Sequence, residues 1–355
     1  MKHLLVILLT LPLLAACGRP PVTVEKSLPP ERIQRRTLTY GSAPQLSSLS
    51  VLSERLLGSP ALAGLLEDDT PVGLTAQVFE PDDRRERPAI VYIHGGAFVH
   101  GSTNVKDPTT ELIGAEFARR GYRVYAITYR SMNLLAPSFL RAGYTAAQDG
   151  RMAIRYLHDH AEELHLDTDN VFLVGYSAGG ITALATAFLD GDEALLGEAN
   201  ELRATLGPLT PLPEYDEDSP LAGLISIAGA VLEKEWLDGQ PLPTLLIHGE
   251  EDAIIPLDCD KPVPGASGLL EAGLDALLRS TEKDWLREGL ENARLPVVCG
   301  SAALREVAEA RGMDVTYQEI PGAGHFILLD ARGEVTRDTE KVLDMMARYA
   351  HEHLR

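Results

Sequence analysis

Short apolar runs alternate with longer amphipathic segments along most of this chain of 355 residues. Runs typical of buried strands occupy residues 75–79, 89–93, 123–129, 171–176, 221–228, 244–248 and 315–320. Helical patterns occupy residues 108–120, 142–163, 181–189, 301–311 and 336–351. This alternation predicts an α/β fold with a mostly parallel central sheet flanked by helices, whose ligands bind beyond the carboxyl ends of the strands.

The start of the chain has a different pattern. Lys2 precedes an apolar run at residues 4–15, which is too short to span a bilayer and is typical of an export signal. The run ends in Leu-Ala-Ala-Cys, which resembles the lipobox of bacterial lipoproteins. The resemblance implies cleavage before Cys17, lipid on its thiol, and an anchored protein facing the periplasm or the cell surface. The outer membrane is favoured because no aspartate follows Cys17; the alternative is an ordinary signal peptide that contains a cysteine.

Proline is frequent after the apolar run, at positions 20, 21, 29 and 30. Such a segment is expected to form an extended tether, and about 20 residues of coil span about 25 Å. We therefore expect a signal peptide at residues 1–16, a lipidated tether at residues 17–40 and one folded domain at residues 41–355.

The charge of the chain excludes some partners. The formal net charge is −20. Nucleic acid is not expected as a partner, because its binding depends on Lys and Arg that neutralise phosphates. Electrostatic attraction to anionic lipid is disfavoured for the same reason, so membrane contact is expected only through the anchor at Cys17.

A serine flanked by glycines lies between the strand at residues 171–176 and the helix at residues 181–189. Residues 175–179 read Gly-Tyr-Ser-Ala-Gly. A tight turn between a strand and a helix needs small residues beside its tip, and such a turn exposes the serine hydroxyl for attack. Ser177 is therefore predicted as a nucleophile. The alternative is a glycine-rich turn that carries an ordinary surface serine.

A serine hydroxyl needs a base, and the base needs a group that orients it. His325 follows the strand at residues 315–320 in a glycine-rich loop, and we predict that it is the base. Asp252 follows the strand at residues 244–248, and we predict that it is the acid. Other acidic residues in the same loop compete for this role: Glu250, Glu251 and Asp258.

Backbone donors for a developing oxyanion are predicted in two turns. Gly95 and Gly96 follow the strand at residues 89–93, and glycine lets a backbone N–H approach a substrate oxygen closely. The N–H of Ala178, directly after the nucleophile, supplies the second element. The alternative for the two glycines is a plain turn.

Together these motifs resemble the α/β-hydrolase carboxylesterases, and in particular the His-Gly-Gly esterases and lipases that are similar to hormone-sensitive lipase. The resemblance covers about residues 72–350 and rests on the motifs at residues 94–98, 129–130, 149, 175–180, 248–252 and 324–325. It implies an α/β-hydrolase fold and hydrolysis of small-molecule carboxylic esters without a cofactor or a metal. Ala97 departs from the pattern, since many relatives have a third glycine there. The resemblance also suggests that Phe98, Leu134, Leu135 and Phe139 line the acyl pocket.

The segment between Asp252 and His325 is longer than in these relatives, and the excess lies at residues 257–300. Its leucines have helical spacing, so we expect a helical insertion that either covers the substrate cleft or packs away from it. Cys259 and Cys299 stand at its two ends. Because exported proteins form disulfides and Cys17 is assigned to lipid, we expect these two to pair; the alternative is two free buried thiols.

Two alternatives to ester hydrolysis remain. An amidase or peptidase can use the same triad. A non-catalytic binding protein of the cell envelope can keep the fold, but it is expected to lack a triad position, and Ser177, Asp252 and His325 are all present. The sequence does not indicate the acyl length, the natural substrate or the oligomeric state.

Overall fold

The computed structural model describes residues 23, 26–44, 71–98, 107–131, 139–189, 203, 206–209, 212, 221–237, 242–262 and 295–355. Cys17 and the predicted signal peptide lie outside the described residues. So do residues 263–294 of the predicted insertion, together with Leu134 and Leu135. None of the helices in the described ranges has the length and apolar character that a membrane span requires.

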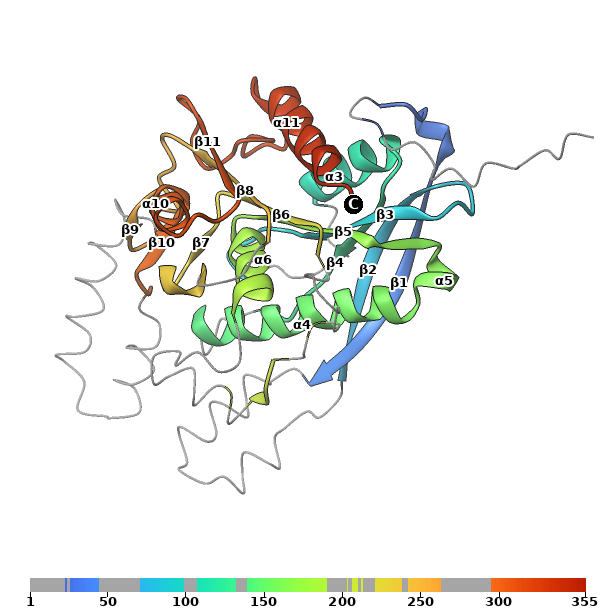
Figure 1. Cartoon of the computed structure of the whole chain (residues 1–355), viewed down its shortest axis with the longest axis horizontal. Coiled ribbons are helices and arrows are strands. Elements are labelled where there is room, and N and C mark those ends of the chain that lie inside the picture. The colour runs from blue at the N-terminus through green and yellow to red at the C-terminus, as the bar shows by residue number, and fades with distance from the viewer. Residues whose placement is uncertain are drawn as a thin grey trace, which may run out of the picture.

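The core of the molecule is an eight-stranded sheet (Figure 1). Its spatial order is β1 (Ile33–Pro44), β2 (Pro71–Pro81), β4 (Arg123–Ile127), β3 (Arg87–Ile93), β5 (Leu166–Tyr176), β6 (Gly223–Ile227), β8 (Thr244–Gly249) and β11 (Val315–Ile320). β1 and β2 pair in antiparallel fashion, as do β2 and β4, and the other neighbours are parallel. The predicted mostly parallel sheet is therefore confirmed.

Helices cover both faces of this sheet. α3 (Pro108–Arg119) and α11 (Thr339–Glu352) lie on one face, and α4 (Phe139–Asp159) and α6 (Ala178–Phe188) lie on the other (Figure 1). Alternate residues of each strand point to opposite faces, so one strand contributes side chains to the hydrophobic cores on both faces of the sheet. In β5, Val171 and Leu173 join the core beneath α4 and α6, while Phe172 and Val174 join the core beneath α3 and α11.

Two segments differ from the prediction. Residues 33–40, assigned to the tether, belong to β1, which pairs along its length with β2. β1 is an edge strand with few buried side chains, Ile33, Tyr40 and Ala43, so its hydropathy pattern contains little signal. The long helix predicted at residues 142–163 is divided into α4 and the short α5 (Ala161–Leu164), which ends at His165 with a left-handed φ of 52°.

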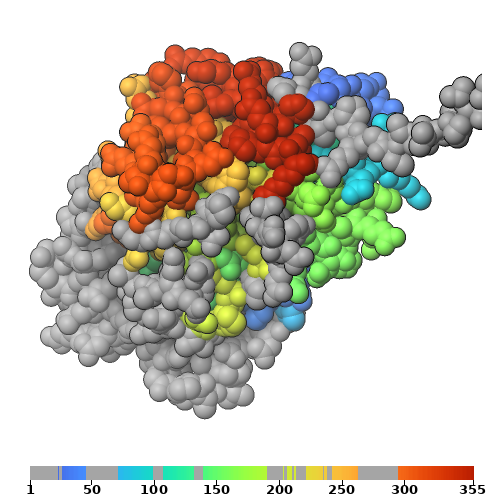
Figure 2. Space-filling model, in the orientation of Figure 1, coloured from blue at the N-terminus to red at the C-terminus, as the bar shows by residue number. Residues whose placement is uncertain are grey.

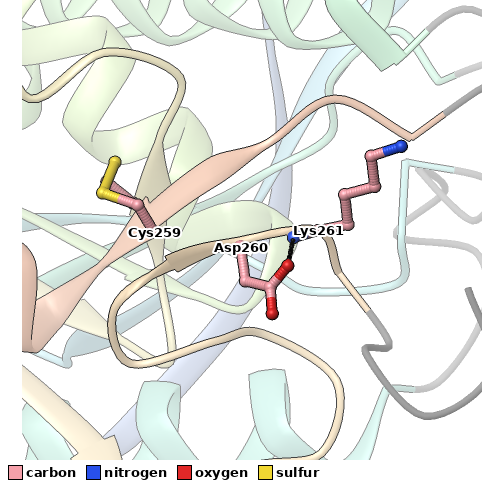
Figure 3. Close-up of a disulfide and its surroundings, with 4 residues drawn as sticks. Cys259, Asp260 and Lys261 are labelled. Carbon is pink, nitrogen blue, oxygen red and sulfur yellow. Dashed lines mark hydrogen bonds between the residues drawn. A yellow bond between two sulfur atoms is a disulfide. The ribbon is translucent and has the colours of Figure 1, made fainter.

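A second, three-stranded sheet lies beside the acid loop, which is the segment that follows β8. It consists of β7 (Ala230–Val231), β10 (Val298–Gly300) and β9 (Cys259–Asp260). Cys259 and Cys299, which are 40 positions apart in the chain, face each other across β9 and β10 and form a disulfide (Figure 3). Two helices flank this small sheet in the sequence. η2 (Lys234–Leu237) lies between β7 and β8, and α10 (Ser301–Arg311) directly follows β10. In the space-filling view, the orange and red C-terminal elements form one contiguous part of the surface (Figure 2).

Candidate active site

Ser177 occupies the turn between β5 and α6, where its backbone has φ 56° and ψ −122°. This conformation is unfavourable for a serine, so surrounding contacts must hold it in place. Two glycines make the turn sterically possible. A Cβ on Gly175 would lie 2.1 Å from the carbonyl oxygen of Gly179, and a Cβ on Gly179 would lie 1.9 Å from that of Ile93. The small residues predicted at the turn are therefore a steric requirement.

The structure brings Ser177, His325 and Asp252 together from three strand ends. The Ser177 hydroxyl lies 2.8 Å from His325 Nε2, and His325 Nδ1 lies 2.8 Å from Asp252 Oδ2. Because an ionised carboxylate can only accept a hydrogen bond, Nδ1 carries the imidazole hydrogen and Nε2 accepts from the serine. The three side chains thus form one hydrogen-bonded line that ends at a half-buried hydroxyl.

Burial separates Asp252 from its competitors. Its side chain contacts His325, whereas the other acidic residues of the loop are exposed: Glu250, Glu251 and Asp258. Asp252 Oδ1 accepts the backbone N–H groups of Ile254 and Ile255 at 2.8 and 2.9 Å. Burial by itself raises the pKa of the Asp252 carboxyl, but hydrogen bonds from His248 and His325 outweigh it and hold this pKa well below its usual range.

His248 is a contact of the acid to which the sequence analysis gave no role. It is fully buried, and its Nε2 lies 3.2 Å from Asp252 Oδ2 and 3.1 Å from the carbonyl oxygen of Ile255. Its Nδ1 lies 2.9 Å from the hydroxyl of Ser301 at the start of α10. Both neighbours of Nε2 are acceptors, so Nε2 carries the hydrogen and Nδ1 accepts from Ser301. The position of His248 in the motif that contains Asp252 was its only signal in the sequence.

Tyr176 is a second such residue, and it holds the histidine loop. Its hydroxyl donates to the carbonyl oxygen of His325 at 2.7 Å and accepts the N–H of Ile327 at 3.1 Å. Its ring is stacked with the His325 imidazole at a centroid distance of 6.0 Å. Burial raises the pKa of the Tyr176 hydroxyl, which keeps the donor protonated. Tyr176, the residue before Ser177, therefore fixes the position of His325.

The predicted oxyanion loop lies beside Ser177. A Cβ built on Gly95 would lie 3.3 Å from the Ser177 Cβ and 3.9 Å from its Oγ. Gly96 and Ala97 follow with φ 117° and 51°, both in the region that favours glycine. The conformation of Ala97 gives a physical reason for the third glycine expected there in relatives. Ala178 begins α6, so its N–H lies at the positive end of the helix dipole.

An apolar cavity of about 210 Å³ opens at Ser177. Large side chains from several elements line it, among them Phe98, Phe139, Leu140, Tyr144 and Trp236. Within the described residues, no side chain of the lining carries a formal charge. Such a site favours an uncharged, apolar substituent next to the hydroxyl. Of the predicted lining residues, Phe98 and Phe139 are present.

The described part of the chain contains no group of three or more His, Cys, Asp or Glu side chains that could hold a metal ion. The polar atoms of the site are instead bonded to one another, from the hydroxyl of Ser177 to that of Ser301.

Part of the chain that contains this site is similar in sequence to known proteins. A family model described as BD-FAE matches residues 77–206, which include the oxyanion loop and Ser177. An arylesterase of Saccharolobus solfataricus is 30% identical over 122 residues, or 34% of this chain and 37% of that protein. Esterase LipI of Mycobacterium tuberculosis is 31% identical over 126 residues, or 34% of this chain and 36% of that protein. The match thus spans only about a third of the length of these relatives.

Solved structures resemble the chain over most of its length. Esterase B from Lactobacillus rhamnosis HN001 has a TM-score of 0.51 and 16% identity, and the match covers 91% of this chain and 87% of that one. The carboxylesterase EstE1, cloned from a metagenomic library, has a TM-score of 0.50 and 16% identity, with 91% and 90% covered. At this identity the likeness shows the fold, and the chain has an α/β-hydrolase fold.

Proposed function

We propose that this protein is a serine hydrolase that cleaves carboxylic esters through an acyl-enzyme. The observation that carries the proposal is the hydrogen-bonded line from Ser177 through His325 to Asp252, which opens onto an uncharged cavity. The BD-FAE family model matches residues 77–206, which include Ser177 and the oxyanion loop, and the esterases that are similar over about a third of the chain support ester hydrolysis. Asp252 and His325 lie outside that stretch, so their roles rest on the geometry.

Each group has one task in the proposed reaction. Ser177 attacks the ester carbonyl while His325 Nε2 takes its proton, and Asp252 stabilises the imidazolium that forms. The N–H groups of Gly95 or Gly96 and of Ala178 donate to the oxyanion. His325 then protonates the leaving alcohol. In the second half, it activates a water molecule that releases the acid and restores Ser177.

The test is Ser177→Ala, assayed on p-nitrophenyl esters beside Ser42→Ala, a change at an exposed position of β1. We expect Ser177→Ala to lose nearly all of kcat, because the nucleophile is absent, and Ser42→Ala to behave as wild type. Circular dichroism verifies the fold of both variants. A Ser177→Ala protein that retains the wild-type rate excludes this mechanism.

The sequence at residues 14–17 supports a further part of the proposal, a lipid anchor on Cys17. With a tether after it, the anchor would hold an exported catalytic domain near a membrane. Two or more acyl chains are needed for firm attachment, since a single chain binds only marginally.

A further inference from the structure

The cavity at Ser177 runs between two helices that pack on the same face of the sheet. α4 lines it with residues three and four positions apart, which share one face of a helix: Phe139, Leu140, Gly143 and Tyr144. α6 and its C-cap line it with a stripe spaced every four residues: Ile181, Ala185 and Leu189. The two helical faces form two walls of this cavity, which we call the slot, and residues of other elements complete its lining, among them Phe98, Trp236 and Ile255.

Gly143 is the open position in this slot. Within the described residues, no atom lies within 4 Å of a Cβ built on Gly143. Gly150, two turns later in the same helix, is a useful contrast, because its Cβ would lie 2.5 Å from Thr186 Oγ1. Packing against α6 thus requires the glycine at 150 but not the one at 143. Glycine also weakens a helix interior relative to alanine, so helix stability does not explain Gly143 either.

On the basis of the proposed function, we infer that Gly143 is a specificity-determining residue, which keeps the slot open for an uncharged aliphatic chain of the ester. Among the described residues, no polar or charged side chain lies within 4 Å of this space, so it suits methylene groups. Each methylene that enters an apolar site improves binding by about fourfold. Filling the space at residue 143 therefore removes this gain for the carbons that occupy it, and esters too short to reach it should be unaffected.

The experiment compares wild type with Gly143→Leu and Gly143→Ala on two series of esters. One series is p-nitrophenyl esters of linear acids from acetate to dodecanoate, and the other is acetates of linear alcohols of the same lengths. We expect the kcat/KM optimum of Gly143→Leu to move to shorter chains in one series, with about tenfold or greater loss on the longest chains, because each excluded methylene costs about fourfold in binding. The series whose optimum shifts shows whether the acyl chain or the alcohol chain of the ester occupies the slot. Gly143→Ala, which favours the helix, should shift the optimum in the same direction by less.

Gly73→Leu is the matched control, because a Cβ at Gly73 also meets no described atom within 4 Å, yet this residue is exposed in β2. Its chain-length profile should equal that of wild type. An unchanged profile in both Gly143 variants overturns the inference, even if all the proteins hydrolyse esters.

A binding measurement separates this inference from the proposed function. In the Ser177→Ala background, linear 1-alkanols of increasing length should raise the melting temperature progressively, and Gly143→Leu should abolish the increase for the longer alcohols. This result supports the slot even if wild type hydrolyses no ester. Equal shifts with and without Gly143→Leu count against it.

Discussion

At the scale of single residues, the site depends on a carboxylate shared by two histidines. Asp252 Oδ2 lies 2.8 Å from His325 Nδ1 and 3.2 Å from His248 Nε2, and all three side chains are buried. These donors keep the acid ionised despite its burial, so it remains available to stabilise imidazolium. Asp252 is therefore expected to affect both the catalytic rate and the pH dependence of the free energy of unfolding.

Replacing Asp252 by asparagine should lower kcat by about 10⁴-fold, because the amide can no longer hold the imidazole tautomer or stabilise its charge. Steady-state hydrolysis of a p-nitrophenyl ester measures the effect. Asp258→Asn is the control, since Asp258 is exposed in the same loop and should keep the wild-type rate. A similar loss in both variants contradicts the choice of acid.

The lowered pKa of Asp252 also predicts how the stability of wild type and of Asp252→Asn responds to acid. A carboxyl whose pKa is lower in the folded state adds stability above its unfolded pKa of about 3.9, and this is lost as the pH falls through the folded pKa. The free energy of unfolding of wild type should therefore fall more steeply below about pH 4 than that of Asp252→Asn. Urea unfolding at several pH values measures both slopes, and parallel slopes speak against the shift.

Sequence reasoning identified Ser177, Asp252 and His325 by their order and their places after strands. It chose Asp252 over Glu250, but the physical grounds for this choice, exposure and distance to the histidine, are visible only in the folded structure. It also gave no role to His248 and Tyr176, whose hydrogen bonds to the acid and to the histidine loop exist only after distant segments have folded together.

At the scale of elements, the disulfide joins the two ends of the segment in which the sequence predicts an insertion. Cys259 lies in β9 and Cys299 in β10, and Ser301, two positions later, contacts His248. The backbone N–H of Gly300 also donates to the carbonyl oxygen of Asp258 in the acid loop. The cross-link therefore restrains the strand that supports the acid side of the site.

Replacing Cys299 by serine should lower the free energy of unfolding by about 4 kcal/mol, because the unfolded chain gains the freedom of a loop of 40 residues. Chemical denaturation without reductant measures the difference. Wild type with a reducing agent should approach the variant, which is the internal control. Equal stability of the oxidised protein and the variant argues against this role.

The sequence predicted the cysteine pair but not the short strands that carry it, since strands of two and three residues have no hydropathy period. It likewise missed β1, whose register is specified by pairing with β2 more than by buried side chains. The central parallel strands were predicted well, because strands buried on both faces appear as continuous apolar runs.

At the scale of the whole molecule, the folded domain and the proposed anchor have separate tasks. The eight-stranded sheet brings the ends of β3, β5, β8 and β11 together at one edge, where the site lies. The proposed anchor at Cys17 precedes this domain in the chain and contributes no residue to the triad. Removing the anchor should therefore change location and leave chemistry intact.

Replacing Cys17 by alanine should release the protein from membranes of a bacterial host that processes lipoproteins, because no thiol is left to carry lipid. Fractionation followed by an ester assay measures both properties, and kcat/KM should stay within about twofold of the wild-type protein in detergent. Metabolic labelling with a fatty acid should mark wild type only. A Cys17→Ala protein that stays in the membrane fraction contradicts the anchor.

The most direct test of the central claim is to trap the acyl-enzyme. Mixing excess p-nitrophenyl ester with enzyme, quenching in acid within milliseconds and mapping peptides by mass spectrometry locates the acyl group. We predict one acyl group per molecule, on the peptide that contains Ser177, with a matching burst of p-nitrophenol and neither signal in Ser177→Ala. Sustained hydrolysis with no acylated Ser177, or with the acyl group on another residue, would contradict the account.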